Sequence, residues 1–182
     1  MSLWQLPQRA QIGDREYTLH TDYRDVLEIF SYLDDETLPE AVRWRIALGL
    51  FFEEKIPEED VVLAAEYFSW FVSCGQSQKG GERLLCWQQD APMIVAEVNR
   101  VAGQEIRALP YLHWWTFLGW FHTIGEGRFS TVVALRRKLR RGQPLESWEK
   151  TFYRENRGEI DLPRKYSPQE LAEREKLEQL LK

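Results

Sequence analysis

The sequence predicts a mainly α fold: a single compact multi-helix domain with a short N-terminal β-hairpin. Apolar residues recur at helical spacing through most of the 182 residues, whereas within residues 8–20 apolar and polar residues alternate around Gly13-Asp14. Ser, Thr, Asp or Pro precedes most of the apolar stretches, as is typical of helix starts. A chain of this length buries about two-thirds of its unfolded surface. We therefore expect one helical domain over residues 1–166.

The hairpin is predicted from "QRAQIGDREYTLH", residues 8–20. Ala10–Ile12 would form one strand and Glu16–Leu19 the other. Gly13-Asp14 between them is a Gly-first pair of the kind that closes a two-residue turn.

Three helices are expected before residue 75. Thr21 or Asp22 would cap the first, which carries apolar residues at helical spacing as far as Leu33. The second would begin with a Thr37-x-x-Glu40 capping box and Pro39 in its first turn. The third follows Pro57 and three acidic residues, which the positive end of a helix dipole favours.

Residues 75–83, "GQSQKGGER", have the composition of a linker, and we expect a mobile surface loop there. The next helix would have Asp90 as its cap, Pro92 in its first turn and Gly103 just past its end. Further helices are predicted within 129–141, 147–157 and 167–182. The last is mostly charged, and we expect it to be loosely docked.

The stretch Ala108–Phe121, "ALPYLHWWTFLGWF", raises the question of an active site at His113. No nucleophile or carboxylate adjoins this histidine, and Leu109 and Phe117 hold the helical positions where a second metal ligand would stand. We expect a structural histidine that bonds a backbone carbonyl. With Pro110 in its first turn, the helix is apolar nearly all round, which indicates a buried central helix or one that also feeds an oligomer interface.

Two candidate interaction surfaces emerge. Trp114, Trp115 and Trp120 would serve core and interface packing, with a cage for a cation or sugar as the alternative. The second candidate is the basic run formed by Arg136, Arg137, Arg140 and Arg141. Those cations suit a helix carboxyl end, and the alternative is a binding surface for an acidic protein or nucleic acid.

Charge is unevenly distributed along the chain. Residues 1–75 contain 15 acidic and 6 basic residues, and residues 76–182 contain 14 and 18, which gives −9 and +4. This asymmetry favours head-to-tail protein contact over nucleic-acid binding. The chain has no phosphate-binding loop and no Cys/His cluster, and its apolar runs are too short to span a membrane. We therefore expect a protein that is not an enzyme and needs no cofactor or metal.

Three segments together carry a family resemblance: "GDREYTLHTDYRDVLEIFSYLDD", "CWQQDAPMIVAEVNRVAGQEI" and "LPYLHWWTFLGWFHTIGEGRFSTVVALRRK". Over about residues 10–166 the chain resembles the bacteriophage gene-product-fifteen family of tailed phages and prophages. Members show Thr-Asp-Phe-Arg after the hairpin, then Asp-Ala-Pro, then Leu-His-Trp-Trp. Here Tyr23 replaces the phenylalanine, and Gln88-Gln89 replaces a more acidic run.

The resemblance implies a non-enzymatic tail morphogenesis protein in the host bacterial cytoplasm. It implies a tail assembly chaperone that binds the tape-measure protein or other phage tail proteins and forms a homo-oligomer. The alternatives are a structural virion component at the head–tail or tail-completion stage, and a nucleic-acid-binding regulator that uses residues 135–141. The resemblance carries no catalytic residues.

Overall fold

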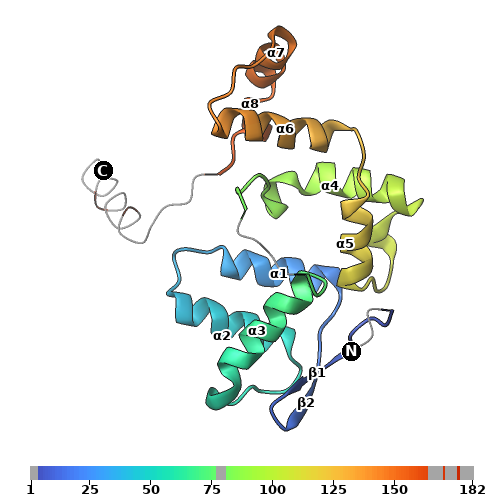
Figure 1. Cartoon of the computed structure of the whole chain (residues 1–182), viewed down its shortest axis with the longest axis vertical. Coiled ribbons are helices and arrows are strands. Elements are labelled where there is room, and N and C mark those ends of the chain that lie inside the picture. The colour runs from blue at the N-terminus through green and yellow to red at the C-terminus, as the bar shows by residue number, and fades with distance from the viewer. Residues whose placement is uncertain (1–3, 77–80, 164–169, 171–175, 177–182) are drawn as a thin grey trace. The chain divides into compact units, whose positions relative to one another are not determined.

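A computed structural model describes residues 4–76, 81–163, 170 and 176 of the chain (Figure 1). It confirms the mainly α class and the N-terminal hairpin. The chain divides into two compact units, the first made of residues 1–78, 113–115 and 164–182 and the second of residues 79–112 and 116–163. The expected single domain over 1–166 stays a prediction. The centre of the predicted loop, residues 77–80, and all of the predicted helix over 167–182 except residues 170 and 176 lie outside the described residues.

The first unit begins with the hairpin, β1 (Arg9–Ile12) and β2 (Arg15–Thr18), which pair antiparallel with Ala10 opposite Tyr17. Gly13 adopts φ +56° in the turn, a conformation that suits glycine. The alternation predicted from the sequence is observed: Ala10, Ile12 and Tyr17 are buried. The Glu54 carboxylate accepts the Thr18 N–H at 2.8 Å, so a segment 36 residues away holds the end of β2.

Three helices complete this unit: α1 (Tyr23–Leu33), α2 (Glu40–Phe51) and α3 (Val61–Val72), which follows a 3-10 turn, η1 (Glu58–Asp60). Their core is aromatic. The Phe51 ring lies 5.0 Å from the rings of both Phe68 and Phe71, centroid to centroid. Burying several aromatic rings at these separations contributes both area and edge-to-face attraction.

The cap of α1 is as predicted, because the Asp22 side chain accepts the Arg24 N–H at 2.9 Å. The capping box predicted for α2 is wrong. Pro39 precedes the helix without a side-chain cap, and the Thr37 hydroxyl donates to Asp35 Oδ1 at 2.6 Å. Asp35, two residues upstream, also accepts the Thr37 N–H at 2.9 Å. This local turn uses the hydroxyl that a capping box needs.

The second unit contains α4 (Trp87–Ala102), a 3-10 turn η2 (Ile106–Ala108), α6 (Arg128–Arg140), α7 (Ser147–Glu155) and α8 (Arg157–Ile160). It also contains residues 116–122 of α5 (Trp114–His122). A buried cluster is formed by Val132, Leu135 and Ile160, and partly buried side chains from α4 and α7, together with Leu145, pack against it. Gly103 ends α4 with φ +68°, as its place after the apolar stripe predicts.

Candidate binding site

His113 is a structural residue, as predicted. Its Nε2 lies 3.1 Å from the carbonyl oxygen of Pro7, and its Nδ1 accepts the backbone N–H of Trp115 at 3.0 Å. A neutral ring with its proton on Nε2 satisfies both contacts. Burial lowers the pKa of His113, which keeps the ring neutral near pH 7, although the bond to Pro7 acts in the opposite direction. Both ring nitrogens are engaged by backbone, so the ring has no proton-transfer role to play here.

The two tryptophans after His113 close the carboxyl end of α3. The last carbonyls of a helix have no partner within the helix. Trp114 Nε1 donates to the Val72 carbonyl at 3.0 Å, and Trp115 Nε1 donates to the Phe71 carbonyl at 2.8 Å. Trp114 is buried, so its assignment to an interaction surface is wrong. Its indole is needed inside the first unit. The prediction that Pro110 lies in the first turn of α5 is also wrong, because α5 begins at Trp114, and the His113 ring just before it accepts the Trp115 N–H.

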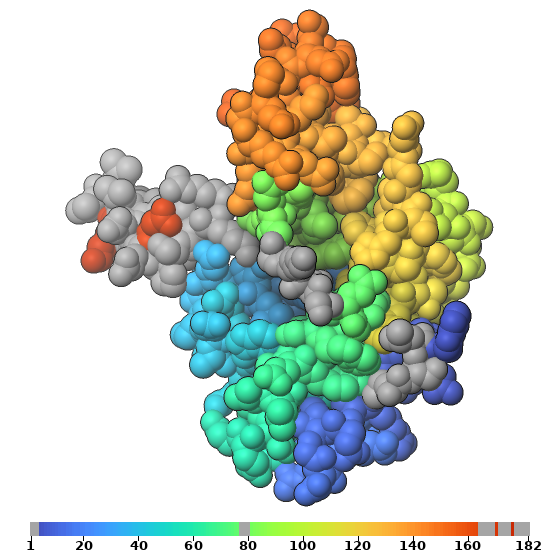
Figure 2. All heavy atoms as spheres, viewed as in Figure 1, coloured from blue at the N-terminus to red at the C-terminus, as the bar shows by residue number. Residues whose placement is uncertain are grey.

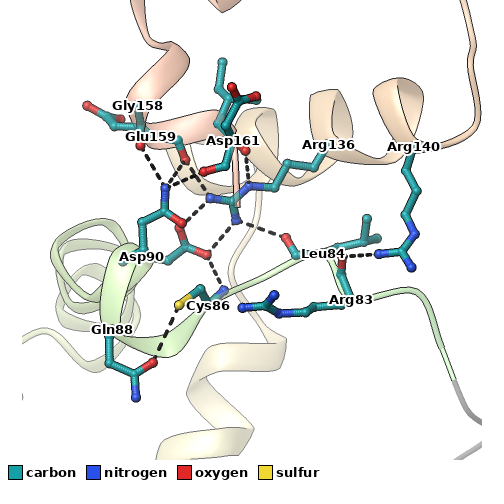
Figure 3. Close-up of polar contacts among 12 residues, drawn as sticks. Arg83, Leu84, Cys86, Gln88, Asp90, Arg136, Arg140, Gly158, Glu159 and Asp161 are labelled. Carbon is teal, nitrogen blue, oxygen red and sulfur yellow. Dashed lines mark hydrogen bonds and ion pairs between the residues drawn. The ribbon is translucent and has the colours of Figure 1, made fainter. Parts of the chain in front are cut away.

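Arg136 is buried as well, and its side chain bonds several segments of the second unit (Figure 3). Its five N–H groups find five acceptors: Nη1 and Nη2 reach the Asp90 carboxylate at 2.6 and 2.8 Å, and the carbonyls of Leu84, Glu159 and Ile160 lie at 3.0, 2.6 and 2.8 Å. The planar guanidinium suits such two-pronged pairing with a carboxylate. A side chain enclosed in this way cannot present its charge to a partner, so Arg136 does not belong to the predicted surface.

Asp90 was predicted as the cap of α4, and this is wrong. The helix begins three residues earlier, at Trp87. The Asp90 carboxylate turns back from inside the helix to accept the Cys86 N–H at 2.9 Å while it holds Arg136 (Figure 3). The preceding residue is Gln89, and its Nε2 donates to the carbonyls of Gly158 and Asp161 at 2.8 and 2.9 Å. This cluster joins α4, α6 and α8 by polar bonds.

The other three arginines of the basic run are exposed. Arg140 donates to the Arg83 carbonyl at 3.1 Å and Arg141 bonds Glu82 at 3.2 Å. The hydrogen bond from Arg141 lowers the pKa of Glu82, burial acts in the opposite direction, and the nearby positive charges of the arginines lower the pKa further. The basic end of α6 therefore anchors residues 82–84 and leaves Arg137, Arg140 and Arg141 at the surface. Trp120 is half-buried on α5 in the same unit.

A groove between α2 and α3 is the site that the sequence analysis missed. It has a volume of about 940 Å³. Its lining is mainly apolar or small, with charged residues beside it: Ala41, Trp44, Arg45, Leu48, Gly49, Lys55, Ile56, Glu58, Val61, Val62, Ala65, Glu66 and Ser69. Both helices are visible on the face drawn in Figure 2. The signal was present in the run Val61-Val62-Leu63, since a helix cannot bury three successive residues on one face.

The groove exposes apolar surface. Val62, which lines it, is 68% exposed. Val42 and Leu63, on the same two helices, are also exposed. Large apolar side chains that remain in water are typical of protein-binding surfaces. The residues arranged here can bind an apolar partner.

No helix in the described part of the chain is both long and apolar enough to cross a membrane. Within residues 4–76 and 81–163, no three His, Cys, Asp or Glu side chains gather closely enough to hold a metal ion.

The fold and this surface define a mainly α protein whose buried polar groups are structural and whose candidate site is an apolar groove. The chain belongs to the Bacteriophage Gp15 protein family, whose model matches residues 4–162. Membership indicates a bacteriophage structural or morphogenesis protein. No curated protein and no solved structure matches the chain significantly.

Proposed function

We propose that this protein is a tail assembly chaperone that binds the tape-measure protein in the cytoplasm of the host bacterium and does no chemistry. The observation that carries the proposal is the open apolar groove between α2 and α3. A chaperone for a long helical substrate needs such a groove, because an amphipathic helix binds by laying its apolar face into one. Many copies along one substrate then add weak contacts into tight binding.

We further propose that the chains associate head to tail. The exposed arginines Arg137, Arg140 and Arg141 supply positive charge at the end of α6. The first 75 residues carry a net charge of −9. Opposite charges on two ends of one chain suit an assembly in which each copy contacts the next.

The test is co-expression with the tape-measure protein encoded in the same genome. We expect the two proteins to co-purify, and light scattering over a range of concentrations to show oligomers larger than the monomer. Co-purification should fall when Val62 is replaced by Gln, and Leu63→Gln, on the same helix but outside the groove, is the matched control. A chain that stays monomeric alone and leaves the tape-measure protein unbound contradicts the proposal.

Mass spectrometry of purified virions separates the chaperone from the alternative of a structural virion component. A chaperone leaves before the tail is complete, so its peptides should be missing from particles that contain the tube and tape-measure proteins. Stoichiometric amounts in the particle would favour the structural role.

A further inference from the structure

We propose that the arginines at the end of α6 bind the acidic turn between α1 and α2 of a second copy of this chain. This inference rests on the proposed function and adds the two surfaces that meet when the chains associate. Each surface consists of side chains whose charges are not balanced within one copy.

The basic surface lies in the second unit, where the end of α6 meets the segment before α4. It consists of Arg83, Arg137, Arg140 and Arg141, with Glu82 beside Arg141 at 3.2 Å, so its net charge is +3. Arg137 precedes the other two α6 arginines by three and four residues, a spacing that places side chains on one face of a helix.

Two of these guanidinium groups are held in place by carbonyl groups. Arg140 Nη1 donates to the Arg83 carbonyl at 3.1 Å (Figure 3), and Arg83 Nη1 donates to the Pro163 carbonyl at 3.2 Å. A carbonyl occupies one of the five N–H groups of a guanidinium and does not cancel its charge. Within the described ranges 4–76 and 81–163, Arg83, Arg137 and Arg140 form no ion pair. Their charges are therefore available to an acidic partner, and two of the three side chains are already ordered for it.

The acidic surface belongs to the first unit and follows the carboxyl end of α1. From residue 25 to residue 42 the chain has six acidic residues and no Lys or Arg. Four of the six gather in and beside the turn between α1 and α2: Asp34, Asp35, Glu36 and Glu40. Arg43 adds one positive charge there, because it donates to the Leu33 carbonyl at 2.9 Å. The net charge of this surface is −3, which equals that of the basic surface with the opposite sign.

The position of these acidic residues is unfavourable in a single copy. The carboxyl end of a helix carries partial negative charge, which cations stabilise and anions do not. The last turn of α1 has no basic residue, and Asp34 is its capping residue. Glu36 and Glu40 form no ion pair with any residue that the structure describes. Guanidinium groups brought by a second copy would offset this repulsion.

The charge of the whole chain selects a second copy over nucleic acid as the partner of the arginines. The chain has a net charge of −5, and its first 75 residues have a net charge of −9, so most of its surface repels phosphate groups. A second copy instead supplies the matching acidic surface. Each contact then uses the basic surface of one copy and the acidic surface of the next, which is the heterologous arrangement that builds rings or open chains.

Sedimentation velocity of the full-length chain over a range of concentrations tests this contact. We expect association at about 0.01 M salt and its loss at about 1 M, because the screening length falls from about 30 Å to about 3 Å. Arg137→Glu with Arg140→Glu reverses the basic surface, and Glu36→Lys with Glu40→Lys reverses the acidic one. Each double variant should associate about tenfold or more weakly than the unchanged chain, since like charges then face each other.

An equimolar mixture of the two double variants gives the most specific result. Association should return in the mixture, because each reversed surface again meets the opposite charge. Lys150→Glu with Arg154→Glu is the matched control, since both cations are exposed on α7, four residues apart and outside the basic surface. It should associate like the unchanged chain. Thermal melting verifies folding, and Arg137→Gln with Arg140→Gln replaces the Glu variant if that variant does not fold.

A chain that stays monomeric at low salt, a double variant that associates like the unchanged chain, or a mixture that stays monomeric overturns this inference. Binding of a fluorescent DNA duplex that requires Arg137 and Arg140, without self-association, would assign the arginines to phosphate groups and also overturn it. In each case, co-purification of the tape-measure protein with the unchanged chain would leave the proposed tape-measure binding intact.

Discussion

Removing the charge of Asp90 provides the sharpest test of how the second unit is held together. The side chains of Arg136 and Asp90 are 3% and 0% exposed, with 2.6 Å between Nη1 and Oδ2. Asp90→Asn preserves the shape, but it leaves a guanidinium without a counter-charge. Its new NH₂ group also faces a donor, since all three bonds to the carboxylate come from N–H groups.

Breaking a buried pair by changing one partner costs about 3–5 kcal/mol. Small domains are stable by about 5–15 kcal/mol, so this loss is a large fraction of the total. Arg136→Lys keeps the charge, but an ammonium has three donors where the guanidinium has five. At least two acceptors would lose their bonds, and each buried polar group left unsatisfied costs about 1–3 kcal/mol.

Urea denaturation followed by far-UV circular dichroism measures these losses from the shift in midpoint. Arg157→Gln is the control, because Arg157 pairs with Asp161 at a similar distance of 2.9 Å while both side chains are largely exposed. Its effect should stay below about 1 kcal/mol. An Asp90→Asn cost of under about 1 kcal/mol would refute the reasoning, whereas an unfolded Asp90→Asn beside a folded control would agree with it.

Three other outcomes are expected. Burial lowers the pKa of His113 below its ordinary value, so the unfolded chain binds the proton more readily than the folded chain. The free energy of unfolding should therefore be at its full value above about pH 6.5 and fall as the pH drops below it. His113→Asn, which keeps a cap acceptor and does not titrate, should lose less stability between pH 7.5 and 5.5 in urea melts; an equal loss would contradict this. Burial raises the pKa of Cys74 to about 11 and Cys86 is buried, so a thiol reagent at pH 8 should label native protein far more slowly than free cysteine and label both thiols in denaturant. Rapid labelling of the native chain would count against it. Phe51→Ala should cost about 3–5 kcal/mol and exposed Val62→Ala within about 0.5, as measured by denaturation, and equal costs would place the core elsewhere.

Much of the fold could be predicted because its signals are local. The hairpin alternation, the Asp22 cap and the terminating Gly103 each depend on neighbours within a few residues. The errors arose where a distant or competing partner decided the outcome. Asp90 looks like a cap until Arg136, 46 residues away, is brought beside it. Thr37 looks like a cap until Asp35 takes its hydroxyl.

The same limit explains the candidate site. The sequence pattern placed Arg136 on the surface together with the other three arginines of the basic run. Those three are exposed, but Arg136 is buried. The adjacent tryptophans indicated packing, but no pattern showed that the carbonyls of Phe71 and Val72 needed their N–H groups. The groove depends on two helices lying side by side. The sequence indicated it through Val62, which lines the groove and has no place on the buried stripe of α3.

The indole bonds to the end of α3 have a consequence for biosynthesis. Residues 113–115 belong to the first unit, although 34 residues of the second unit, 79–112, come between them and residue 78. While the ribosome is still making those residues, the carbonyls of Phe71 and Val72 lack the two donors that later cover them. The amino-terminal part of the nascent chain must therefore wait for Trp115 to emerge before it can finish folding, and a gene fragment that stops at residue 78 would encode an incomplete unit.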